Sequence, residues 1–195
     1  MWPWEHLAVG YIAFSLLQRA RGGRGVGTSA AVTLAVGTQL PDLVDKLLGW
    51  GLGVLPGGRS LGHSLFFVVP VVVVGYLVAR HLGRRDVGEA FGVGYLLHLP
   101  GDMAYPALLG GDVAYRFLLW PIVPAPESEP VTVLGRTLEL LTYFAGELTG
   151  SAGAVYVVFE ALLLGTALVL WLRDGHPGLP TRGRRRTADE NTPSR

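Results

Sequence analysis

The chain has 195 residues, of which half are hydrophobic and only 16% are charged. Soluble domains carry about a quarter of charged residues, so this composition favours an integral membrane protein. The formal net charge of +1 gives no reason to expect nucleic-acid binding. The absence of cysteine excludes disulfides, thiolate metal sites and cysteine nucleophiles, so any metal ion would need histidine and carboxylate ligands.

Apolar segments predict a series of helices. In chain order they are expected over about 5–19, 28–48, 62–80, 87–103 and 152–173. The runs 61–79 and 154–172 have the roughly 20 apolar residues that a membrane span needs, and the others reach that length only with polar residues at their ends. The predicted fold is an all-α, polytopic helical bundle with about five transmembrane helices, formed by residues 1–175.

Arginines indicate how the bundle is oriented. They cluster at 19–24, at 80–85, and from Arg173 into a polar tail, 176–195, that is expected to be disordered. Basic residues favour the cytoplasmic side of a membrane. Placing all three clusters inside gives a consistent multi-pass path in the cell membrane, with a cytoplasmic C-terminus.

The segment 131–149 predicts a different kind of helix. Arg136, Glu139 and Tyr143 follow one another at spacings of three and four, so they share one helical face. A further crossing here would place the basic tail outside. The segment is therefore predicted to be an interfacial or re-entrant helix on the outer side.

Histidines and aspartates gather where the predicted helices reach the outer side. Four separate segments bring them to this level, and the residues are His6, Asp42, Asp45, His63, His98 and Asp102. Imidazole and carboxylate groups suit zinc, and also manganese or iron.

Spacing divides these residues into two possible metal sites. His98 and Asp102 are four apart and share a helical face, so with Asp42 and His63 they predict a four-ligand site. His6 and Asp45, with Asp102 shared, would hold a second ion. Pro41 is expected to break the helix beside Asp42.

Simpler roles are open for each residue taken singly. Asp42 and Asp45 could be interfacial carboxylates paired with Lys46, and His98 with Asp102 could be a structural hydrogen-bonded pair. Their joint position at one membrane level favours the metal site. Glu160, within the last helix, is expected either to pair with a polar residue of another helix or to be protonated.

Four motifs in order, "WEHLAVGY", "LPDLVDK", "RSLGHS" and "GYLLHLPGD", resemble the membrane-bound metal-dependent hydrolases of bacteria and archaea over about residues 4–120. That family is remotely similar to the secreted zinc-dependent phospholipase C. The resemblance implies ligand roles for the aspartates and histidines above except His6, whose place follows the order of ligands in the secreted enzymes. It puts Arg59 and Ser64 beside His63. The chain departs from the family pattern at four positions: Lys46 and Gly58 stand where histidines are usual, Ser60 stands for a glycine, and Gly62 stands for a threonine.

The expected function is a membrane-bound hydrolase of phosphoester bonds that uses a divalent metal, zinc first, near the outer face. Membrane lipid is the expected partner, as a lipid or headgroup substrate. Asp45 is the candidate general base or second-metal ligand, and Arg59 would hold the substrate phosphate. The alternatives are a cation transporter, with Glu160 as its mid-span acid, and a structural membrane protein in which a metal ion joins helices.

Overall fold

The computed structural model describes residues 1–23, 25–108, 111–125, 132–149 and 153–179. Throughout these residues the regular structure is helical, which confirms the all-α prediction. The predicted helices agree with those observed to within a few residues at most ends. The larger part of the expected tail, 180–195, and residues 126–131 lie outside the described residues. The helices are α1 (Pro3–Ala20), α2 (Thr28–Lys46), α3 (Leu65–His81), α4 (Arg85–Leu108), α5 (Val133–Thr149) and α6 (Gly153–Arg173), with short turns η1 (Leu47–Gly51) and η2 (Arg116–Leu119).

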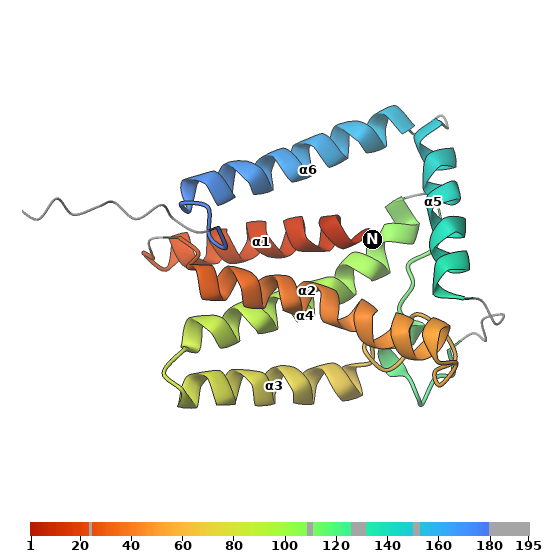
Figure 1. The fold of residues 1–195 in the computed structure, drawn as a ribbon, viewed down its shortest axis with the longest axis horizontal. Helices are drawn as coiled ribbons and strands as arrows, with labels where there is room; N and C mark the ends of the chain where they lie inside the picture. Colours follow the sequence, from red (N-terminus) through yellow and green to blue (C-terminus); the bar gives the residue numbers. More distant parts are fainter. Residues whose placement is uncertain (24, 109–110, 126–131, 150–152, 180–195) are drawn as a thin grey trace, which may run out of the picture.

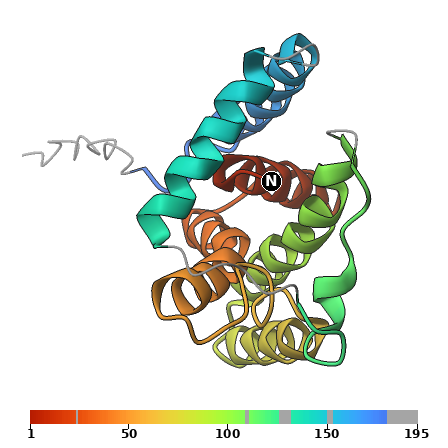
Figure 2. The ribbon, with the colours of Figure 1, turned by 90° about the vertical axis from the view of Figure 1, so that its right-hand side faces the viewer.

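Helices α1, α2, α3, α4 and α6 run side by side, and α5 runs across one end of the bundle (Figure 1). Helix α4 lies at the centre and contacts α1, α2 and α3. Figure 2 looks onto the end that α5 crosses, where it reaches from α6 to η1. Its crosswise direction sets α5 apart from the other helices.

Glycines allow the central helices to approach closely. A Cβ atom at Gly37 of α2 would lie 2.5 Å from the carbonyl oxygen of Phe91 in α4, and one at Gly94 would lie 2.6 Å from that of Leu34. Backbones can come this close only where a side chain is absent. This packing holds α2 and α4 against each other, and both helices carry predicted ligands.

The expectation that Pro41 breaks α2 is wrong. The helix continues through it to Lys46 and then widens into the π-helical turn η1. Proline removes one N–H bond, to the carbonyl group four residues earlier. The close packing of Gly37 against α4 supports this part of the helix, and the nearby carbonyl group of Thr38 accepts a hydrogen bond from His98. Asp42 and Asp45 therefore both lie on a continuous helix.

Helix α6 is attached to α1 by polar contacts near both ends. The buried carboxylate of Asp174 accepts hydrogen bonds from Tyr11 and Ser15, each at 2.8 Å. Toward the other end, the indole N–H of Trp4 donates to Glu160 Oε1 at 3.1 Å. Glu160 thus pairs with a polar residue of another helix, which was one of the two roles expected for it.

Helix α6 is also the one helix among the described residues that is long and apolar enough to cross a membrane, with a mean hydropathy of 2.2. Helix α3 is apolar but shorter. The finer prediction of about five spans is therefore not confirmed by helix length and composition.

Candidate metal centre

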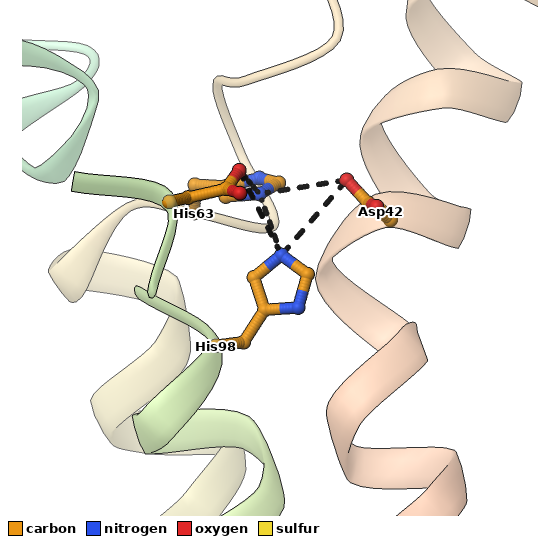
Figure 3. Close-up of side chains that lie close together, drawn as sticks. Asp42, His63 and His98 are labelled. Atoms are coloured by element: carbon orange, nitrogen blue, oxygen red, sulfur yellow. Dashed lines mark hydrogen bonds and ion pairs between the residues drawn. The ribbon is translucent and has the colours of Figure 1, made fainter. Parts of the chain in front are cut away.

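Four of the predicted ligands meet at one point inside the bundle. Asp42 comes from α2, His63 from the loop before α3, and His98 and Asp102 from α4. One ligand atom from each lies within 4.8 Å of the other three, and all four residues are buried. Figure 3 shows Asp42, His63 and His98 directed toward one another from these separate segments.

Hydrogen bonds behind the two imidazoles fix which nitrogen atoms face the centre. His63 Nδ1 lies 2.8 Å from Asp45 Oδ2, and His98 Nδ1 lies 2.7 Å from the carbonyl oxygen of Thr38. An ionised carboxylate and a carbonyl group only accept hydrogen bonds, so each Nδ1 carries the hydrogen. In the neutral rings each Nε2 therefore presents a lone pair, and the two Nε2 atoms face each other at 3.1 Å.

Carboxylate oxygens surround these lone pairs. Asp42 Oδ1 lies 3.7 Å from His63 Nε2 and 3.9 Å from His98 Nε2, and Asp102 Oδ2 lies 3.5 and 4.0 Å from the same atoms. In a tetrahedral site with bonds of about 2.0–2.1 Å, ligand atoms are about 3.3–3.4 Å apart. The spacings that involve an imidazole, 3.1–4.0 Å, are close to that value, and all four ligand atoms lie within 4.8 Å of one another. Four acceptors at these distances repel one another unless a cation, a proton or a metal ion, lies among them.

Asp45 lies behind His63 rather than at the centre. Its two oxygens accept hydrogen bonds from the backbone N–H groups of Ser60 and Gly62, at 2.6 and 2.7 Å, as well as from His63. The side chain is fully buried. A carboxylate that holds the outer nitrogen of an imidazole fixes the ring for metal binding. The geometry favours this orienting role over the expected ones of general base or second ligand.

The charge around His63 favours a cation. Burial lowers the pKa of His63, but the hydrogen bonds with Asp102 and Asp45 outweigh burial, and the pKa lies above its ordinary value. The same carboxylates that favour a proton on this ring would favour a metal ion beside it.

His6 lies next to the four-residue group. Its ring stacks on that of His98, with centroids 3.7 Å apart, and its Nε2 lies 3.2 Å from Asp102 Oδ1. Neither ring nitrogen makes a hydrogen bond within the described part of the chain. His6 and Asp102 are thus brought together as predicted for a second ion, whereas the contacts of Asp45 lie with Ser60, Gly62 and His63.

Two cationic side chains border the group. Arg59 Nε lies 2.7 Å from Asp102 Oδ2, and Lys46 Nζ lies 2.5 Å from Asp42 Oδ2. The amino group of Met1 also contacts Asp102, at 2.6 Å from Oδ1. Asp42 therefore has one oxygen toward the imidazoles and the other toward Lys46, so the expected pairing of Asp42 with Lys46 is present together with the cluster.

The loop before α3 owes its position to small residues. A Cβ atom at Gly62 would lie 2.6 Å from the carbonyl oxygen of Pro41, and one at Gly58 would lie 2.6 Å from Cζ2 of Trp50. The Trp50 indole thus fills the space where the resemblance would place a histidine. Ser64 begins α3, since its Oγ accepts from the N–H of Phe66, and its hydroxyl donates to the carbonyl oxygen of Trp120. Ser64 thus caps the N-terminus of α3.

Some parts of this site have no signal in the sequence. The Thr38 carbonyl group is backbone, and the roles of Asp45 and Lys46 depend on which way each side chain turns from α2. Glu5, a buried acid next to His6 in the chain, was not among the predicted site residues. Its position within an apolar helix could have indicated it, because acids are rare in such helices.

Comparison with known proteins yields one match. The family model described as YdjM inner membrane protein matches residues 1–175. No curated protein and no solved structure matches the chain.

Proposed function

Since the chain belongs to the YdjM inner membrane protein family, we propose that it is a membrane-bound, metal-dependent hydrolase of phosphoester bonds. The proposed metal ligands are Asp42, His63, His98 and Asp102. Zinc suits two imidazoles and two carboxylates best, and manganese or iron would also bind such a set.

One observation carries the proposal: the Nε2 atoms of two imidazoles lie 3.1 Å from each other and 3.5–4.0 Å from an oxygen of each of two carboxylates. The Nδ1 hydrogens of both rings are used by Asp45 and Thr38, so only an additional cation could lie between the facing atoms. That cation would be a proton in a purely hydrogen-bonded cluster and a metal ion in the proposed site.

Each residue around the centre has a proposed role. A bound divalent ion would lower the pKa of a coordinated water and supply hydroxide near neutral pH. Asp45 fixes the His63 ring, and the Thr38 carbonyl group fixes that of His98. Arg59, partly exposed beside Asp102, is placed to hold a substrate phosphate by bidentate hydrogen bonds. His6 with Asp102 would accept a second ion.

The membrane arrangement is part of the proposal. Helices α1, α2, α3, α4 and α6 would cross the bilayer, and α5 would lie at the outer surface next to the metal centre. Helices α1, α2 and α4 pair their polar groups inside the bundle, which is how polar residues are tolerated at membrane depth. A lipid or its headgroup is the proposed substrate class.

Metal content tests the proposal directly. Purified protein should bind about one zinc ion per chain tightly, and hydrolyse a phosphodiester such as bis(p-nitrophenyl) phosphate. His98→Ala and Asp102→Ala should lose both properties. His81→Ala, at the exposed end of α3, is the matched control and should keep both. Full zinc content in His98→Ala would refute the site.

A cation transporter is the second candidate, and one cluster favours it. The Tyr156 hydroxyl lies 2.6 Å from Glu5 Oε1 and 2.9 Å from Glu160 Oε1. Because a hydroxyl has a single hydrogen, one of the two carboxyl groups must carry a proton or share a cation. Flux in proteoliposomes that falls in Glu160→Gln and survives in His98→Ala would favour transport.

A metal that only joins helices is the third reading, and it differs from the enzyme in one property. A closed shell of four protein ligands leaves no position for water. Chelation would then lower the melting temperature, and no phosphodiester would be hydrolysed at any zinc concentration.

A further inference from the structure

The charged and ligating side chains of the metal centre fall into a buried group and a partly exposed group. The side chains of His63, His98 and Asp45 are fully buried, and that of Asp102 is 3% exposed. Lys46 and Arg59 are 31% and 38% exposed. An anion that approaches the centre from solvent therefore meets these two cations before it reaches any ligand.

Both cations are held in place from two sides. Lys46 contacts Asp42 and lies over the Trp50 ring, with Nζ 5.6 Å from the centroid. Arg59 contacts Asp102 and lies over the Phe117 ring at 5.9 Å. Fixed cations lose less conformational entropy when they bind an anion than mobile surface cations do.

The charge balance of the centre suits an anionic ligand. With neutral imidazoles, the carboxylates of Asp42, Asp45 and Asp102 are balanced by Lys46, Arg59 and the amino group of Met1. A divalent ion would make the centre positive. The positive charge would then be concentrated on the metal and on the two exposed cations.

A third cation near this rim is already compensated. Arg136 of α5 also lies over the Trp50 ring, with its Cζ atom 6.0 Å from the centroid. Its guanidinium group pairs with the carboxylate of Glu139 at 2.8 Å. Lys46 and Arg59 differ from it because their carboxylate partners are proposed metal ligands. Metal binding would compete with Arg59 for Asp102 Oδ2. It would also reduce the negative charge that Asp42 presents to Lys46, so both cations could bind an anion.

We propose that Lys46 and Arg59 together bind a phosphate-type oxyanion directly above the metal centre, as an anion clamp. Lys46 would act as a point charge and Arg59 as a planar donor of two hydrogen bonds. The clamp deepens the proposed function, on which it rests for the metal beneath it. The oxyanion could be a free phosphate or the phosphate of a lipid headgroup.

Binding of two soluble probes tests the clamp. Inorganic phosphate and dihexanoylphosphatidylglycerol are titrated separately into zinc-loaded wild-type protein in detergent. Lys46→Gln and Arg59→Gln should each weaken phosphate binding by about tenfold or more, since each removes one charge-assisted contact. Lys46→Arg should retain most of the affinity. Arg85→Gln, which removes an exposed arginine paired with Glu89 at the far end of α4, is the control and should change nothing.

The two probes distinguish the sources of the oxyanion. Tighter binding of the lipid than of inorganic phosphate, with equal sensitivity to Lys46→Gln, would assign the clamp to headgroups. Stronger binding of inorganic phosphate would assign it to free phosphate. Phosphate affinities of Lys46→Gln and Arg59→Gln within twofold of wild type, with folding and zinc content intact, would overturn the clamp.

Zinc content keeps this failure separate from that of the proposed function. If the wild-type protein binds no zinc, the hydrolase proposal fails, and the same titrations are repeated with EDTA present. Phosphate binding that Lys46→Gln and Arg59→Gln abolish under these conditions would still support the clamp. Equal binding by all variants would overturn it.

Discussion

The buried carboxylate of Asp45 accepts three hydrogen bonds. Substituting Asp45 tests whether this residue orients the His63 ring or binds the metal ion itself. In Asp45→Asn, the new amide group must direct its N–H hydrogens at a donor, either a backbone N–H or His63 Nδ1–H. We expect zinc affinity to fall by about 10–100-fold, the usual cost of losing such a partner. Competition with a chromophoric chelator measures this, with exposed Asp112→Asn as control. Wild-type affinity in Asp45→Asn would contradict the orienting role.

Residue types and helical register were enough to predict which four side chains meet. His98 and Asp102 share a face because they are four apart on a helix, and this holds in α4 although Pro100 lies between them. The difference between Asp42 and Asp45 was not predictable in this way. They are three apart on α2, and only the loop carrying Ser60 and Gly62 decides that one faces the centre and the other lies behind His63.

At the level of elements, glycine spacing decides how α2 and α4 meet. Gly94→Ala would place a Cβ atom 2.6 Å from the carbonyl oxygen of Leu34, so the two backbones must separate. We expect a loss of stability of about 1–3 kcal/mol. Gly165→Ala in α6 is the matched control, because no atom lies within 4 Å of its added Cβ. Thermal unfolding in detergent should show a lower melting temperature for the first variant alone.

An equal melting temperature for both alanine variants would show that α2 and α4 can separate at little cost. The metal centre offers a second measure, since His98 and Asp102 follow Gly94 on the same helix. Separation of α4 from α2 should move them away from Asp42 and weaken zinc binding as well.

Helix positions followed from apolar periodicity, whereas the continuity of α2 did not. A proline inside an isolated helix would end or kink it. In the bundle, Gly37 of α2 packs against the backbone of Phe91 in α4, and Gly62 of the loop before α3 packs against Pro41 itself. Tertiary contacts of this kind connect residues far apart in the sequence, so a local reading of the proline could not include them.

The whole molecule is polarised from end to end. The turns between α1 and α2 and between α3 and α4, and the end of α6, lie together at one end, and they carry the arginine clusters (Figure 1). The metal centre, η1 and α5 lie at the other end. Folding thus unites basic segments that are far apart in sequence, which is the pattern expected of a single cytoplasmic face.

This polarity predicts which end of the molecule faces out. The chain has no cysteine, so single cysteines can be introduced without background labelling. Val54→Cys, 69% exposed in the loop after η1, should react with an impermeant thiol reagent in right-side-out membrane vesicles. Arg84→Cys, exposed in the turn between α3 and α4, should react only after permeabilisation. The reverse pattern would place the metal centre on the cytoplasmic side, and a lipid substrate would then have to come from the inner leaflet.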